Sequence, residues 1–195
     1  MKKKLLAIIF ISNFLLFNTF AIEPDVFVQS TVNRASQILS ENLSKERKIE
    51  ELKSIAKDTV DIRGIGFYTL GAARKNLSDT NKIRYSELFE QYFLKSFSSR
   101  LAEYTNPEID VFAKEVINKN YTIVNSILKA TKDRPEIKIN WRIYTKNPDS
   151  PLIRDLIIEG LSLARTQKEE FASILSSNNN DINILINKLE DFNKN

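Results

Sequence analysis

The sequence predicts an α+β fold, a twisted antiparallel β-sheet of about four strands wrapped by N- and C-terminal helices. Two observations predict it. Apolar residues recur at helical spacing from about Asp25 to Tyr104 and again after Leu163, but they alternate with polar residues between Glu108 and Glu159. The chain has only four glycines and five prolines, so the elements should be long and should form one domain.

The N-terminus has the layout of a secretory signal peptide. Lysines occupy positions 2–4, an apolar run covers residues 5–17, and small residues precede a cleavage point near Ala21. The alternative is an uncleaved membrane anchor, but the run is short for a membrane span. We therefore expect residues 1–21 to be removed on export and residues 22–195 to form a single domain.

The composition argues against several classes of function. The chain contains no cysteine and no histidine, which removes disulfides, the commonest zinc ligands and the usual general base near neutral pH. Without the signal peptide its net charge is close to +1, too low for a typical nucleic-acid-binding protein. We expect no metal, no cofactor, no nucleic acid and no enzyme activity.

The first helical block divides into several segments. Apolar spacing marks helices before and after a charged joint at residues 44–47, and a third, more apolar segment covers residues 62–73. Ser78 has the position of an N-cap, with Asp79 in the first turn. The long helix that follows carries one apolar face and ends before Asn106-Pro107. Its face consists of Tyr85, Leu88, Phe89, Tyr92, Phe93, Phe97, Leu101 and Tyr104.

The middle block predicts the strands. Residues 137–144 alternate apolar and polar side chains, which is typical of a half-buried strand. Residues 121–128 are rich in β-branched side chains, and residues 111–117 form a less regular third candidate. A turn at residues 147–150 precedes an apolar strand over residues 151–158. Two C-terminal helices follow, over residues 163–175 and from the N-cap Asp181 onward.

The Arg63-Gly64-Ile65-Gly66 sequence has some likeness to a phosphate-binding loop. It lacks a third glycine, follows no predicted strand and precedes no Gly-Lys-Ser/Thr sequence. We expect its glycines to allow close helix packing or a kink.

Aromatic residues are the informative excess, with twelve phenylalanines, six tyrosines and one tryptophan. They either fill a packed core or line a cavity between sheet and helices for an apolar ligand. Sequence periodicity does not distinguish a filled interior from a hollow one, so both interpretations stay open at this point.

Two motifs resemble the MlaC-like (toluene-tolerance) phospholipid-binding proteins. The first covers residues 65–74, Ile-Gly-Phe-Tyr-Thr-Leu-Gly-Ala-Ala-Arg, and is followed by Phe89, Phe93 and the Leu101-Ala-Glu-Tyr104 sequence. The second, residues 155–163, reads Asp-Leu-Ile-Ile-Glu-Gly-Leu-Ser-Leu and looks like the family's Asp-x-x-x-Glu-Gly-x-Ser-Leu signature. The resemblance extends over about residues 26–192.

The resemblance implies a periplasmic phospholipid carrier with acyl chains held between sheet and helices. Its partners would be an inner-membrane ABC transporter with an MCE-domain subunit and an outer-membrane lipoprotein–porin complex, in the maintenance of outer-membrane lipid asymmetry. We expect a monomer that carries phospholipid and has no catalytic residues. The residues expected to line the lipid cavity are Phe67, Leu70, Phe89, Phe93, Phe97, Val124, Leu128, Ile139, Trp141, Ile143 and Ile153.

Three departures from the family pattern concern the headgroup rather than the acyl chains. Pro151 replaces a common tryptophan, Ala73 replaces an aromatic residue, and Gln167-Lys168 replace a Tyr-Arg pair. Two other functions stay open: a periplasmic interaction protein or chaperone with a filled core, and a lipid hydrolase, for which no residues provide support.

Overall fold

The computed structural model describes residues 21–195 of the chain. The predicted signal peptide lies, apart from Ala21, outside the described residues. No helix in the described part of the chain is both long enough and apolar enough to cross a membrane.

Helices occupy the two blocks of the sequence in which the apolar spacing is helical. Among the described residues they are α1 (Pro24–Ser40), α2 (Lys45–Thr59), α3 (Ile62–Thr69), the short 3-10 helix η1 (Ala73–Asn76), α4 (Asp79–Leu101), α5 (Leu163–Ser176) and α6 (Ile182–Lys194). The predicted third helical segment is therefore shorter than expected.

Polar side chains begin several of these helices. Ser44, Ser78 and Asp181 precede α2, α4 and α6, and each side chain accepts a hydrogen bond from a backbone N–H of the first turn. Such a bond satisfies one of the N–H groups that a helix start leaves without a partner. The N-caps predicted at Ser78 and Asp181 are confirmed.

The middle block forms an antiparallel sheet in which the strands follow one another in sequence order. The strands are β1 (Ile109–Asn118), β2 (Tyr121–Leu128), β3 (Ile137–Tyr144), β4 (Leu152–Ile158) and β5 (Leu161–Ser162). Across the sheet Val124 is opposite Trp141, and Ile143 is opposite Ile153. The predicted α+β class is confirmed, with a fifth strand of two residues in addition to the expected four.

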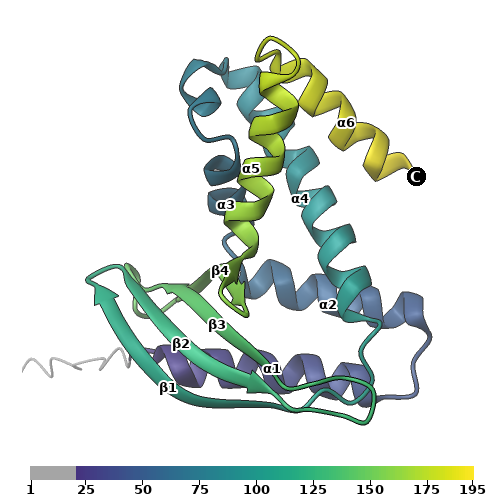
Figure 1. Cartoon of the computed structure of the whole chain (residues 1–195), viewed down its shortest axis with the longest axis vertical. Helices are drawn as coiled ribbons and strands as arrows, with labels where there is room; N and C mark the ends of the chain where they lie inside the picture. Colours follow the sequence, from purple (N-terminus) through teal and green to yellow (C-terminus); the bar gives the residue numbers. More distant parts are fainter. Residues whose placement is uncertain (1–20) are drawn as a thin grey trace, which may run out of the picture.

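Helices cover the sheet unevenly (Figure 1). Helix α1 runs along the sheet against β1 and β2, whereas α3 and α5 lie side by side and contact β4. Helix α4 packs on α2, α3 and α6. A single parallel bridge between Val60 and Ile153 fixes the start of α3 to the edge of β4. Buried residues of α4 and of the inner face of the sheet belong to one connected apolar cluster, which α3 and α5 link.

Candidate functional site

The inner face of the sheet supplies six of the residues expected to line a lipid cavity. Alternation along β2 and β3 turns every second side chain inward. All six are at most 8% exposed. They are Val124 and Leu128 of β2, Ile139, Trp141 and Ile143 of β3, and Ile153 of β4.

One polar pair lies within this apolar face. The indole nitrogen of Trp141 donates a hydrogen bond of 2.8 Å to the hydroxyl of Ser126, which donates one of 3.0 Å to the carbonyl of Ile139. Ser126 is 1% exposed, so these bonds satisfy groups that water does not reach. The pair fixes the orientation of the indole ring across β2 and β3.

Three phenylalanines of α4 form an aromatic row at intervals of four residues. Phe89 is buried, and its ring centroid lies 6.3 Å from that of Phe93. Phe93 and Phe97 stack at 5.3 Å with an interplanar angle of 16°. Both of these rings are only partly buried and pack against the core cluster. The row therefore runs from a buried end at Phe89 to a more accessible end at Phe97.

Helix α3 contributes the last two of the expected residues, and they differ in position. Leu70, at the end of α3, is 3% exposed and belongs to the core cluster. Phe67 is partly buried, and the guanidinium of Arg63 lies 5.6 Å from the centre of its ring. The eight buried residues of the expected set thus share one apolar cluster, and Phe67, Phe93 and Phe97 pack against it.

Residues outside the expected set complete the aromatic row. Tyr85 stacks on Phe89 at 5.8 Å, and Phe171 of α5 meets Phe89 edge-on at 6.3 Å. Both are at most 3% exposed. Their apolar helical spacing was visible in the sequence, but spacing alone did not reveal that α5 lies against α4 at this point.

The two glycines of the Arg63-Gly64-Ile65-Gly66 sequence have structural roles. The carboxylate of Asp61 caps α3 by accepting a 2.8 Å bond from the Gly64 N–H, and a Cβ at position 64 would collide with it. A Cβ at Gly66 would lie 2.8 Å from a ring carbon of Phe89. The expected close helix packing is confirmed at Gly66.

The second motif builds the connection from β4 to α5. Glu159 and Gly160 form a two-residue turn with φ of 49° and 82°, between Ile158 and Leu161, which pair across the hairpin. Asp155 is 4% exposed and accepts bonds from the Ser162 hydroxyl at 2.6 Å and the Ala164 N–H at 3.0 Å. The motif residues thus serve as turn and helix cap.

The only buried charged residue among residues 21–195 is Asp155 of β4, whose carboxylate accepts hydrogen bonds from the start of α5. Burial raises the pKa of the Tyr85 and Tyr92 hydroxyls, so both stay protonated at neutral pH. The Tyr85 hydroxyl donates to the Gly66 carbonyl at 3.1 Å, and that of Tyr92 donates to Gln167 Oε1 at 2.7 Å. Such an interior suits an apolar ligand far better than an ionic one.

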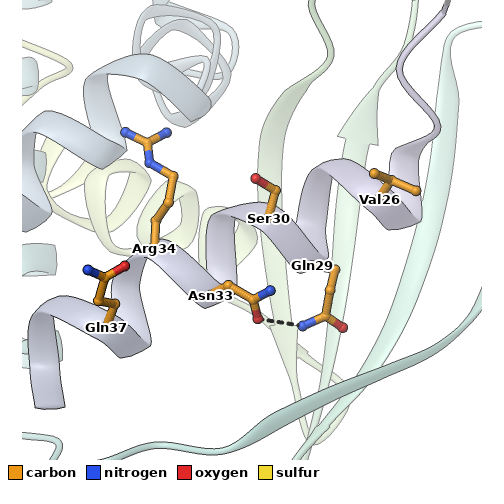
Figure 2. A pocket seen from close by; sticks show the side chains of 6 residues that line it. All are labelled: Val26, Gln29, Ser30, Asn33, Arg34 and Gln37. Atoms are coloured by element: carbon orange, nitrogen blue, oxygen red, sulfur yellow. Dashed lines mark hydrogen bonds between the residues drawn. The ribbon is translucent and has the colours of Figure 1, made fainter.

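Two hollows on the surface of the described chain lie away from this interior. One, of about 410 Å³, lies on the exposed side of α1, as Figure 2 shows. It is lined by Val26, Gln29, Ser30, Asn33, Arg34 and Gln37. The other, of about 370 Å³, is lined by residues of α4 and α6. Neither hollow includes any of the eleven expected lining residues.

A charged connection joins the sheet to the start of α3. Arg154 Nε donates to Asp61 Oδ2 at 2.7 Å, and Arg154 Nη1 donates to the Tyr121 hydroxyl at 2.7 Å. The same guanidinium lies 3.9 Å from the centre of the Tyr144 ring. These contacts link β2, β3 and β4 to the helix that carries Phe67 and Leu70.

The comparison with protein-family models gives a match to one family. The family is described as MlaC protein, and the match covers residues 29–191, which include all the elements around the aromatic row. The chain belongs to the MlaC family. The match includes both motifs on which the sequence resemblance rested.

A solved structure has the same MlaC fold. It is a phospholipid-binding protein from Ralstonia solanacearum in complex with a phospholipid, with a TM-score of 0.75 and 14% sequence identity. The alignment covers 89% of this chain and 98% of that protein. No curated protein matches the sequence.

Proposed function

We propose that this protein is a periplasmic phospholipid carrier that shuttles lipid between an inner-membrane ABC transporter with an MCE-domain subunit and an outer-membrane lipoprotein–porin complex. Its role would be to maintain outer-membrane lipid asymmetry. A signal peptide of residues 1–21 would direct export, and residues 22–195 would form a monomeric lipid-binding domain. Binding and release of lipid need no covalent step, so the proposal involves no enzyme activity.

The observation that carries the proposal is the shared apolar cluster of sheet and helices. Six inward side chains of the sheet and Phe89 of α4 belong to one apolar cluster, and Asp155 is the only buried charged residue among residues 21–195. Phe93 and Phe97 at the edge of this cluster are only partly buried, so their rings can move with less loss of packing than Phe89. We propose that acyl chains enter beside these two rings.

The energetics favour this kind of ligand. Each methylene that leaves water gains about 0.8 kcal/mol, so two acyl chains outweigh any single hydrogen bond to a headgroup. Selectivity should therefore depend on chain volume more than on headgroup. A partner that binds an open conformation better than the closed one would then drive release.

Membership of the MlaC family and the bound phospholipid of the Ralstonia protein both support the proposal. The eleven lining residues named above are part of the proposal.

A second candidate is an interaction protein with a filled core. The observation in its favour is that the two hollows described above, on α1 and between α4 and α6, lie outside the apolar cluster, whose side chains pack on one another. In this alternative the helical surfaces would hold a protein partner, and the aromatic row would serve stability alone.

Native mass spectrometry of the protein purified from a bacterial periplasm without detergent separates the two candidates. The carrier predicts an adduct with the mass of a phospholipid that is released by organic extraction. A bare polypeptide mass, unchanged after incubation with phospholipid vesicles, would overturn the carrier and favour the filled core.

A further inference from the structure

The outer surface of α3 and α5 carries two aromatic rings, each paired with a cation. On α3 the guanidinium of Arg63 lies 5.6 Å from the centre of the Phe67 ring. Lys168 of α5 reaches across to α3, where its ammonium lies 5.1 Å from the centre of the Tyr68 ring. Arg165 lies one turn earlier on α5 and is exposed. We call these five residues the basic–aromatic face.

The cations of this face lack acidic partners in the described part of the chain. None of the ion pairs found among residues 21–195 involves Arg63, Arg165 or Lys168. Asp61, two residues before Arg63, is already held by Arg154. Glu169 offsets one of the three charges, so the face keeps an excess of positive charge.

Large apolar groups are exposed on α3 and on β5, the strand directly before α5. Tyr68 is 40% exposed, and Leu161, four residues before Arg165, is 59% exposed. Interleaved cations and amphipathic rings are the composition that enters the boundary between lipid headgroups and acyl chains. A protein partner with acidic residues would bind the same cations, but only binding to a membrane would depend on the exposed Tyr68 ring entering a lipid layer.

We propose that the basic–aromatic face docks this protein on the surface of an anionic phospholipid membrane. Its cations meet the lipid phosphates, and the exposed ring of Tyr68 enters the headgroup layer. Because α3 and α5 also carry Ile65 and Phe171 of the apolar cluster, docking brings two helices of the site to the lipid surface. The inference extends the proposed function, and it can fail independently of it.

Flotation of the purified protein with vesicles tests the inference. The protein is mixed with vesicles of phosphatidylcholine alone or of phosphatidylcholine with phosphatidylglycerol, at low and high salt. We expect binding only to the anionic vesicles, and weaker binding at high salt because surface charges are screened. Each neutralised cation should weaken partitioning roughly fivefold, so Arg63→Gln with Lys168→Gln should weaken it about 25-fold.

Two further variants and a matched control complete the design. Arg165→Gln, which changes an exposed residue, should weaken partitioning about fivefold, and Tyr68→Ala should weaken it without changing the salt dependence. The control, Lys57→Gln with Lys188→Gln, removes two exposed cations of α2 and α6 and should bind as the unaltered protein does.

The outcomes separate this inference from the proposed function. Absent binding to anionic vesicles, or equal loss in the control, overturns the membrane surface as the partner. Charge-dependent binding that Tyr68→Ala leaves unchanged overturns the entry of the tyrosine ring into the headgroup layer and indicates a purely electrostatic contact with the lipid phosphates. Native mass spectrometry of the same preparations measures bound phospholipid, so the proposed lipid carriage is tested by a measurement independent of vesicle binding.

Discussion

Gly66 of α3 lies against the Phe89 ring of α4, and a Cβ at position 66 would be 2.8 Å from the Cδ1 atom of that ring. This contact determines how closely the two helices approach. Phe89 in turn touches Tyr85, Tyr92, Phe93 and Phe171, so the glycine positions the buried end of the aromatic row.

We expect Gly66→Ala to lower the free energy of unfolding by about 1–3 kcal/mol, because the added methyl forces the Phe89 ring to move in a packed interior. The direction of this change in stability is informative, because a glycine-to-alanine substitution within a helix otherwise stabilises the protein by about 1 kcal/mol. Urea denaturation measures the change.

A second substitution identifies the contact responsible. Phe89→Leu combined with Gly66→Ala should cost less than the sum of the two single changes, because leucine leaves room for the methyl group. Additive losses of stability would mean that the Phe89 ring does not limit the size of the side chain at position 66.

The sequence predicted the sheet well where one rule governs the pattern. Alternation from Ile137 to Tyr144 correctly placed β3 and its inward side chains, because the side-chain period of a strand is two whatever it packs against. The register between β2 and β3 was not predictable, since it depends on contacts between residues far apart in the chain. Ser126 was therefore missed as the hydrogen-bond partner of Trp141, fifteen residues away.

The site was predictable in composition but not in geometry. Helical spacing identified the aromatic face of α4, and Phe89 indeed occupies its buried end. Spacing did not reveal that Phe97 is less buried than Phe89, because that difference depends on which helices pack against each turn. The link between Asp61 and Arg154 joins residues 93 positions apart, and no local pattern indicates it.

Strand β1 shows the same limit. Its middle lacked clean alternation, and the structure explains why. Bulges interrupt its pairing with β2 at two points, next to Phe112 and Ile117, which are 62% and 52% exposed. Bulges change the side of the sheet to which a residue points, so period-two reasoning fails there.

Enlarging Val124 tests the proposed lipid space directly. Val124 is fully buried on the inner face of β2. If the acyl chains lie against it, Val124→Phe should reduce co-purified phospholipid, measured by native mass spectrometry, with little loss of stability. In a packed core the same change should instead cost about 1–3 kcal/mol in urea denaturation and leave the lipid content unchanged.

Leu185→Phe is the matched control for Val124→Phe. Leu185 of α6 is equally buried, but it belongs to no strand and is not among the expected lining residues. The Leu185→Phe variant should lose stability through overpacking and keep its lipid content per folded molecule. Equal lipid loss in both variants would show that general destabilisation, and not occupation of the lipid space, removes the ligand.

The backbone conformation of Gly160 predicts that a substitution there causes backbone strain without a steric clash. Gly160 has φ of 82°, and a Cβ built there meets no atom within 4 Å. Gly160→Ala should therefore lower the free energy of unfolding by about 1–2 kcal/mol through backbone strain alone. Gly160→Asn should cost less, since asparagine tolerates left-handed conformations better, and equal costs for the two in urea denaturation would contradict this explanation.

Lys114 predicts a pH-dependent contribution to stability. Its ammonium donates a 2.7 Å hydrogen bond to Asp25 and also bonds Glu23, which ties β1 to the start of α1. The bond from Lys114 lowers the pKa of Asp25 below its ordinary value of 3.8, and the bond to Asp25 raises the pKa of Lys114 above 10.5. The side chains of Lys114 and Asp25 are 35% and 38% exposed, so solvent screens the pair and it should contribute less than about 1 kcal/mol.

The two pKa shifts define the pH range of this contribution. Because the pKa of Asp25 is lowered in the folded protein, its contribution to stability is fully present above pH 3.8. This contribution is lost as the pH falls through the folded-state pKa. Because the pKa of Lys114 is raised in the folded protein, its contribution to stability is fully present below pH 10.5. It is lost as the pH rises through the folded-state pKa. Lys114→Met should therefore be less stable than the unaltered protein in urea denaturation at neutral pH, and the difference should shrink on acidification. Lys119→Met changes an exposed lysine in the turn between β1 and β2 that has no ion pair among residues 21–195, and it should show no such difference. A Lys114→Met deficit that persists once Asp25 is protonated would mean that the lysine acts through packing of its stem and not through its charge.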